Sequence, residues 1–234
     1  MTRVSSDAIC LAVRGFFGAG LLFAGATAAA TQKWDFEVFL DDALIGHHHY
    51  VLRDSGAGAV GDAERELKIE ARFNVKVLFI NAYRYTHDAS ERWRGNCLAA
   101  LNARTDDNGA KSEVATAPRG EGLVVATVAA ATAATAAAPV REPVDGCVMS
   151  FAYWNPEMLR QKRLLNSQTG KIETVSITAL GEEKITVRGT PMPATRYRVS
   201  GAKHPIDLWY GADRSWLALQ STLEGGRRLR YQLK

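Results

Sequence analysis

The sequence lacks the motifs on which most nucleotide-dependent and hydrolytic enzymes depend. It contains no glycine-rich phosphate loop and no G-x-S-x-G nucleophile elbow. It also shows no alternation of strands and helices of the kind that builds a parallel α/β sheet. These absences argue against an α/β enzyme fold and against a nucleotide cofactor, and we expect no cofactor at all.

A strong excess of charge of one sign is also missing. The net charge is +4, and the densest basic stretch is Arg227-Arg228-Leu229-Arg230. Because nucleic-acid-binding proteins concentrate their cations in a stripe, we expect no nucleic-acid partner. On a terminal strand, Arg228 and Arg230 would share one face. We interpret that face as a solvated strand or a charged edge that blocks aggregation, with an anionic lipid headgroup or polyanion as the less favoured alternative.

The first thirty residues have the features of a secretory signal peptide. Arg3 and Arg14 provide the positive charge, residues 15–24 are apolar, and Ala28-Ala29-Ala30 offers a cleavage site. An uncleaved anchor is the alternative, but the apolar stretch is diluted by glycine, alanine and threonine. We therefore predict cleavage near Ala30 and a periplasmic or secreted location, with no stable membrane insertion after cleavage. Residues 31–234 would form a single β-rich domain of 204 residues with a net charge of +3.

Cysteine is scarce, and cleavage of the signal would leave only two. Cys97 and Cys147 lie 50 positions apart, and neither belongs to a C-x-x-C motif. An even pair in an oxidising compartment favours a disulfide. Closing a loop of this length is worth about 4 kcal/mol in chain-entropy models. Two separate buried thiols are the alternative.

Helical periodicity is rare, and the dominant period in residues 31–234 is two. In residues 67–77, apolar side chains alternate with polar ones, which is typical of a strand with one buried face. The turn sequence Asp106-Asp107-Asn108-Gly109 predicts a hairpin because asparagine and glycine tolerate positive φ. Strands are expected over residues 34–40, 44–53, 67–77, 81–93, 98–105, 123–128, 172–178, 184–188, 194–200, 206–210, 216–223 and 228–233.

Two segments interrupt this pattern. Asn155-Pro156-Glu157 is a helix-start signal and predicts a short helix to about Leu165. The alanine- and threonine-rich tract at residues 129–138 predicts a surface insertion without a functional role. The fold class is therefore mainly β: a curved antiparallel meander, similar to a half-barrel, with one short helix.

Large apolar residues on the strands provide the candidate ligand site. A half-open barrel would line a groove with them and hold a small apolar ligand, whereas a closed sheet would pack them as a core. Both arrangements place the same residues on the concave face. The candidates are Trp34, Phe36, Leu67, Ile69, Phe73, Trp154, Trp209 and Trp216.

Candidates for metal binding and acid–base catalysis are weak. His47 and His49 would point to the same side of a strand, but a two-ligand site is poor and no third ligand has a suitable spacing. The pairs Asp41/Asp42, Asp106/Asp107 and Glu182/Glu183 fall in predicted turns. We therefore predict no metal, no catalytic residue and no enzymatic activity.

Several short motifs resemble an uncharacterised domain-of-unknown-function family of exported proteobacterial proteins. They are residues 91–93, 105–109, 150–156, 165–170, 207–210 and 225–233. This family has no assigned activity, so the resemblance implies no catalytic residue. More distantly, the expected architecture is similar to the half-barrel of the periplasmic lipoprotein carrier and its outer-membrane receptor. That resemblance implies a concave apolar face able to shield an acyl chain.

Two functions follow as the main hypotheses, and an envelope enzyme assisted by a metal at His47 and His49 is a third. The first is a non-enzymatic binding domain that holds an apolar small molecule, a lipid or a lipidated partner in the concavity of the sheet. The alternative is a structural or interaction domain of the cell envelope with a filled core. The occupancy of the concave face distinguishes them.

Overall fold

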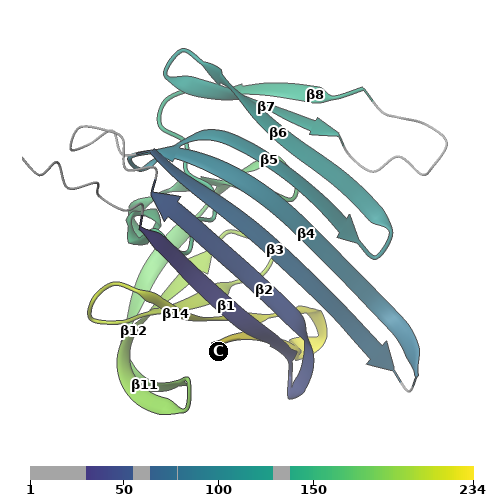
Figure 1. Cartoon of the computed structure of the whole chain (residues 1–234), viewed down its shortest axis with the longest axis vertical. Helices are drawn as coiled ribbons and strands as arrows, with labels where there is room; N and C mark the ends of the chain where they lie inside the picture. Colours follow the sequence, from purple (N-terminus) through teal and green to yellow (C-terminus); the bar gives the residue numbers. More distant parts are fainter. Residues whose placement is uncertain (1–29, 55–63, 78, 129–137) are drawn as a thin grey trace, which may run out of the picture.

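The computed structural model describes residues 30–54, 64–77, 79–128 and 138–234. Thirteen antiparallel strands form one curved sheet, and β9 (Arg163–Leu165) pairs with β10 (Ile172–Thr174) in a small second sheet (Figure 1). The large sheet consists of β1 (Thr31–Leu40), β2 (Ala43–Asp54), β3 (Glu64–Val77), β4 (Ile80–Arg94), β5 (Cys97–Asp107), β6 (Ala110–Arg119), β7 (Gly122–Val128), β8 (Val140–Val144), β11 (Ser176–Val187), β12 (Thr190–Ser200), β13 (Ile206–Tyr210), β14 (Trp216–Thr222) and β15 (Arg228–Leu233).

The sheet is an open meander in which the first and last strands of the chain pair in the middle of the strand order. Strands β1 to β8 and β11 to β15 each follow one another as neighbours, and the two runs join because β15 pairs with β1. In that pairing Phe36 lies opposite Leu233, and Val38 lies opposite Tyr231. The outer strands of the sheet are therefore β8 and β11. The predicted antiparallel meander is confirmed.

The alternation of side chains determines which face of each strand is buried. In β3, Leu67, Ala71 and Phe73 are buried, whereas Lys68 and Glu70 are exposed. The neighbouring strand β4 places Ala89, opposite Ile69, on the buried side. This period-two pattern gives the sheet one apolar and one polar face.

The turn between β5 and β6 forms where the sequence predicted it. Asn108 has φ 52° and Gly109 has φ 94°. The carboxylate of Asp106 accepts a hydrogen bond from the Gly109 amide at 2.7 Å. Both residues adopt positive φ, which glycine and asparagine do at least cost.

The predicted helix is wrong beyond its first turn. Asn155 caps the start and accepts a hydrogen bond from the Glu157 amide at 3.1 Å, as expected. The segment then forms only a five-residue 3-10 turn, η1 (Pro156–Arg160). It ends there because Leu164 and Leu165 pair with β10 and are fully buried, which requires an extended backbone.

Some strand boundaries also differ from the expectation. The sequence predicts strands over residues 172–178 and 184–188, whereas the structure has β10 over Ile172–Thr174 and then β11 from Ser176 to Val187, with a bulge between Ala179 and Gly181. The predicted turn at Glu182 and Glu183 is therefore wrong, because both residues pair with β12. Strands β6 and β8 were not predicted, because most of their side chains are exposed and show no apolar alternation. Residues 129–137 of the alanine-rich tract lie outside the described residues, as do residues 1–29 of the predicted signal.

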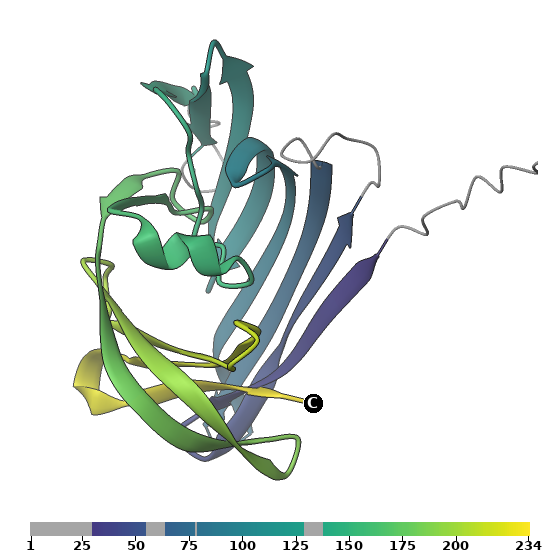
Figure 2. The ribbon, with the colours of Figure 1, turned by 90° about the vertical axis from the view of Figure 1, so that its left-hand side faces the viewer.

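The connection from β8 to β11 lies on the concave side of the sheet (Figure 2). We call residues 145–175 the inserted segment; it contains η1, β9 and β10. Its buried side chains belong to the same hydrophobic core as those of the sheet, among them Val148, Met149, Met158 and Leu164. Among the described residues, no helix is long and apolar enough to span a membrane.

Candidate functional site: the concave face and the segment that covers it

Most of the predicted concave-face residues meet in the main hydrophobic core. Phe36 and Trp216 are fully buried, and their ring centroids lie 4.4 Å apart. Trp34, Leu67 and Phe73 are buried in the same core, and Ile69 is partly buried against it. The sheet therefore brings together six of the eight candidates.

The two remaining candidates lie elsewhere. Trp209 belongs to a second, smaller core with Val187, Ala194 and Leu217. Its neighbours Leu208 and Tyr210 face the main core, so Trp209 points to the opposite side of β13. Trp154 lies on the inserted segment and not on the sheet. It is part of what fills the concave face.

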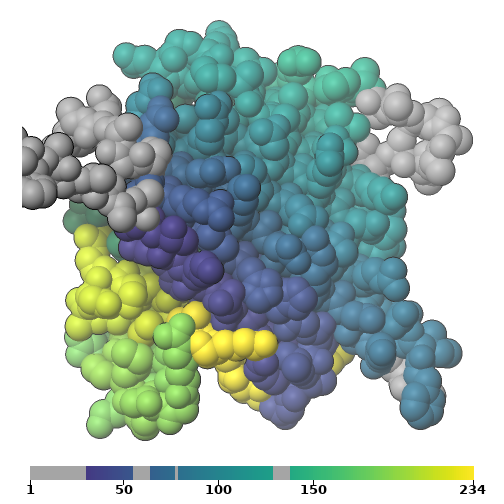
Figure 3. All heavy atoms as spheres, viewed as in Figure 1, coloured from purple at the N-terminus to yellow at the C-terminus, as the bar shows by residue number. Residues whose placement is uncertain are grey.

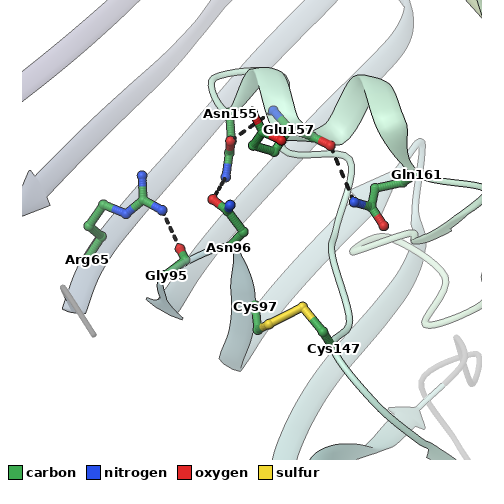
Figure 4. The surroundings of a disulfide bond; sticks show 8 residues. All are labelled: Arg65, Gly95, Asn96, Cys97, Cys147, Asn155, Glu157 and Gln161. Carbon is green, nitrogen blue, oxygen red and sulfur yellow. Dashed lines mark hydrogen bonds between the residues drawn. A yellow bond between two sulfur atoms is a disulfide. The ribbon is translucent and has the colours of Figure 1, made fainter. Parts of the chain in front are cut away.

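Trp154 packs at the end of the concave face where β4 turns into β5. Its ring meets Trp93 of β4 edge to face, with centroids 5.4 Å apart. The Arg65 guanidinium lies 4.7 Å from the centroid of Trp154 and donates a hydrogen bond to the Gly95 carbonyl (Figure 4). A cation above an indole adds electrostatic attraction to the packing.

The start of the inserted segment is bonded covalently to the sheet. Cys147 and Cys97, at the start of β5, form a disulfide with a Cα–Cα distance of 5.1 Å (Figure 4). Directly after it, the Leu98 amide donates to the Val148 carbonyl at 2.8 Å. The Asn155 amide group also donates to the Asn96 side-chain oxygen at 3.1 Å. This is the cysteine pair that the sequence predicted.

Polar contacts hold the rest of the inserted segment on both sides of the concavity. The Tyr210 hydroxyl of β13 donates to the Tyr153 carbonyl at 2.7 Å. The Ser112 hydroxyl of β6 donates to the Gln168 carbonyl at 2.8 Å. The segment therefore bridges the two arms of the open sheet, which have no direct strand pairing between β8 and β11.

Two inward-facing histidines lie beneath this segment. His48 Nδ1 lies 3.2 Å from the Tyr231 hydroxyl and 3.3 Å from the Tyr50 hydroxyl. Burial, with smaller effects from neighbouring histidines, holds the pKa of His48 well below its usual value. Burial also lowers the pKa of His87 to about 4. Both rings are therefore neutral at pH 7.

His87 contacts a serine but is poorly suited to activate it. Its Nδ1 lies 2.9 Å from the Thr105 hydroxyl, and its Nε2 lies 3.5 Å from the Ser167 hydroxyl. The second distance is long for a hydrogen bond. An imidazole with a pKa near 4 is also a weak general base at neutral pH. The Ser167–His87 contact therefore fits a role in seating the inserted segment better than a role in nucleophilic catalysis.

Glu91 is a buried carboxyl group on the same face of β4. It is 2% exposed and accepts a hydrogen bond from Trp93 Nε1 at 2.9 Å. Burial raises the pKa of Glu91 to about 7, against the smaller opposing effect of its hydrogen bonds. This group was missed in the sequence because it occupies an inward position of an alternating strand that also carries exposed charges.

His47 and His49 lie on the same side of β2, as their spacing predicts, and this side is the outer face. Their ring centroids are 4.5 Å apart. His49 Nδ1 contacts the Asp35 carboxylate at 2.8 Å, and His47 Nε2 lies 3.9 Å from Glu70 Oε1. In the part of the chain that the structure describes, no three histidine, cysteine or acidic residues are placed to hold one metal ion.

The outer face of the sheet has shallow hollows, two of which are lined by described residues. The larger hollow, of about 710 Å³, lies over β2 to β6 and includes Ser90, Asn102 and Ala115 in its lining. Its charged rim is paired within the chain, since Arg104 Nε lies 3.2 Å from Glu113. The smaller hollow, of about 270 Å³, lies beside Trp209 and Leu217.

Comparisons with known proteins agree with this architecture. No curated protein sequence matches the chain significantly. A crystal structure of a beta-barrel-like protein of the domain of unknown function DUF1849, from Brucella abortus, has a similar fold, with a TM-score of 0.54 and 8% identity. The match covers 88% of this chain and 95% of that one, and at this identity it concerns the fold alone. The model of the domain of unknown function DUF6134 matches residues 36–234, so the chain belongs to the DUF6134 family.

Proposed function

We propose that this protein is an exported, non-enzymatic interaction domain of the cell envelope that works through its surface. The observation that carries the proposal is the occupation of the concave face by the inserted segment. Segment residues Met149, Met158 and Leu165 are buried in one core with Phe36 and Trp216 of the sheet. A face used in this way contributes to folding stability and leaves the outer surface and the strand ends for contact with partners.

The burial of the tryptophans supports the same proposal. All five, at positions 34, 93, 154, 209 and 216, are at most 8% exposed. A ligand groove lined by indoles would leave some of them accessible in the absence of ligand. Export is part of the proposal, supported by the signal-like residues 1–30 and by the disulfide between Cys97 and Cys147.

Carriage of an apolar ligand or a lipidated partner stays the second proposal. Its supporting observation is that inward-facing Ile69, Val75 and Tyr83 are only partly buried. The inserted segment thus covers the concave face unevenly. A ligand would have to use this less covered part of the face or displace the segment.

Two measurements distinguish the proposals. Native mass spectrometry and lipid extraction of the secreted protein should find the mass of the polypeptide alone. Acrylamide should quench tryptophan fluorescence weakly before urea unfolding and strongly after it. A co-purifying lipid, or strong quenching of the folded protein, would contradict the filled-core proposal and favour carriage.

A further inference from the structure

The end of the β3–β4 hairpin carries the most exposed large apolar side chains among the described residues. Phe79 is 98% exposed and Ile80 is 73% exposed. Single exposed apolar residues are common on protein surfaces. Two consecutive ones, both this exposed at the end of a hairpin, place large apolar side chains where a partner can bury them.

This end of the hairpin extends beyond its neighbouring strands. The pairing of β2 with β3 stops at Gly46 and Phe73, and the pairing of β4 with β5 starts at Tyr85. Residues 74–77 and 79–84, which we call the hairpin tip, therefore form a two-stranded ribbon at the lower right of Figures 1 and 3. Its base is held at Arg84, whose carbonyl accepts a hydrogen bond from the Asn108 amide at 2.8 Å. The end of this ribbon can therefore contact a partner surface without contact between that surface and the neighbouring strands.

The hairpin tip also carries cations that have no acidic partner. Lys76 and Arg84 are exposed, and neither forms an ion pair with a described residue. Nearby Arg72, by contrast, is paired with Asp88 at 2.6 Å. The tip thus combines an apolar end with two available positive charges.

Acidic residues at the same end of the sheet are already engaged. Asp107 accepts a hydrogen bond from the Tyr83 hydroxyl at 2.7 Å. In the β1–β2 turn, Asp41 is paired with Arg227 at 2.8 Å and Asp42 with Arg230 at 3.1 Å. An anionic surface approaching the hairpin tip would therefore meet the two available cations and the ion-paired Asp41 and Asp42. It would also meet the charge of Asp107, which a hydrogen bond from a neutral hydroxyl does not cancel.

We propose that the hairpin tip binds an anionic lipid surface. Phe79 and Ile80 enter the boundary between headgroups and acyl chains, and Lys76 and Arg84 face the lipid phosphates. Apolar burial together with cations beside anionic lipid is the combination that holds a protein at a bilayer surface. The inference deepens the proposed function and rests on it, because it names the surface through which an interaction domain would act.

The test is co-sedimentation with vesicles of phosphatidylglycerol and phosphatidylcholine, compared with vesicles of phosphatidylcholine alone. The secreted protein should bind the anionic vesicles. The double variant Phe79→Ser/Ile80→Ser should bind at least tenfold more weakly, because it loses the apolar anchor. The variant Lys76→Gln/Arg84→Gln should lose roughly fivefold per cation on anionic vesicles only.

A matched control separates the hairpin tip from general surface hydrophobicity. Val140 is 60% exposed and Leu180 is 46% exposed, and both lie on the outer strands of the sheet. The variant Val140→Ser/Leu180→Ser should bind vesicles as the unchanged protein does. Every preparation needs an intact mass that defines its N-terminus, because a retained apolar segment at residues 15–24 would itself bind vesicles.

Three outcomes would overturn the inference: no binding of the unchanged protein to anionic vesicles, equal binding by all variants, or a dimer that Phe79→Ser/Ile80→Ser dissociates. The last would identify the hairpin tip as a contact between two copies of the chain. If the vesicle test fails but no lipid co-purifies and acrylamide quenching is weak, only the proposed lipid contact is refuted and the filled-core proposal stands. A lipid held by the folded protein would instead contradict the filled-core proposal.

Discussion

At the scale of single residues, the core contains two titratable groups whose burial has opposite consequences for the pH dependence of stability. Glu91 is buried with a raised pKa, so the folded protein favours its protonated form. His87 is buried with a lowered pKa, so the folded protein favours its neutral form. The first group stabilises the fold at low pH and the second at high pH. Each contribution can be isolated by substitution.

Replacing Glu91 with glutamine should make the folded protein more stable at alkaline pH, where the buried carboxyl group would otherwise ionise. The pKa of Glu91 rises from 4.5 to about 7 on folding. Its contribution is therefore fully present below pH 4.5 and is lost as the pH rises through 7. Glutamine keeps an acceptor for Trp93 Nε1 without the buried charge. Urea unfolding should show Glu91→Gln more stable than the unchanged protein at pH 8, by up to about 3 kcal/mol, and similar at pH 4.5. An equal difference at both pH values would contradict this account.

Replacing His87 with glutamine should have the opposite pH signature. The pKa of His87 falls from 6.5 to about 4 on folding. Its contribution is therefore fully present above pH 6.5 and is lost as the pH falls through 4. The unchanged protein should lose up to about 3 kcal/mol between these values through His87, and His87→Gln should lose less. Unfolding curves at pH 7 and pH 4.5 measure the difference, and parallel losses in both proteins would refute it.

At the scale of elements, the inserted segment depends on a close approach between the Gly170 backbone and the side chain of Thr127 in β7. Gly170 has φ 71°, and a Cβ there would lie 2.0 Å from the Thr127 hydroxyl of β7. Gly109 has a similar positive φ of 94° but open space around it. The pair therefore separates backbone strain from packing.

Gly170→Ala should destabilise the protein by about 3 kcal/mol, and Gly109→Ala by only about 1 kcal/mol. Both substitutions carry the cost of a side chain at positive φ, but only Gly170→Ala also forces the segment away from β7. Chemical denaturation gives the two free energies of unfolding. Hydrogen exchange should show lost protection at residues 163–174 in Gly170→Ala alone. Equal effects of the two substitutions would mean that the Gly170 contact does not seat the segment.

Removing the disulfide should lower the stability of the inserted segment while the sheet stays folded. Cys97→Ser/Cys147→Ser opens a loop of 50 residues, which in chain-entropy terms costs about 4 kcal/mol. Backbone contacts such as the Leu98–Val148 hydrogen bond remain available. We expect a lower urea midpoint, with the earliest loss of hydrogen-exchange protection at residues 148–158. A variant with an unchanged midpoint would show that the reduced chain is equally ordered without the bond.

The sequence predicts individual strands well and the inserted segment poorly. The alternation in residues 67–77 and the turn at Asn108 and Gly109 are local signals, and both correspond to observed elements. The position of Trp154 over the concave face depends instead on long-range contacts with Trp93 and Arg65. Trp209 lies in a second small core on the opposite face of β13 from Leu208 and Tyr210. All three residues are large and apolar, so the sequence does not show which of the two faces is concave. Neither the contacts of Trp154 nor the second core leaves a periodic pattern in the sequence.

At the scale of the whole molecule, the two outer strands are protected in different ways. Strand β8 contains Pro143, which cannot donate to a further strand, next to Arg141 and Glu142. Strand β11 is bent by its bulge at Gly181 and carries Glu182 beside it. Both devices oppose edge-to-edge pairing between copies of the chain.

The pairing of β15 with β1 joins the two halves of the open sheet. We therefore predict that folding depends on the strand pairs and not on where the chain begins and ends. Lys234 donates its amide to the Asp35 carbonyl at 3.0 Å, so the C-terminus lies beside β1. A permuted chain that joins Lys234 to Thr31 through a short glycine–serine linker, with new ends at Gly189, should keep every strand pair. Gly189 lies in the β11–β12 turn with open space around it.

The permuted chain should therefore unfold cooperatively in urea, with its far-ultraviolet circular dichroism unchanged. Deletion of Arg228–Leu233 removes only six residues but exposes the edges of β1 and β14. It also removes Tyr231 from the core around Phe36 and His48, so this variant should show no cooperative transition. If the permuted chain fails to fold while the deletion variant folds, the β1–β15 pair would not be what joins the two arms. The inserted segment alone would then hold them together.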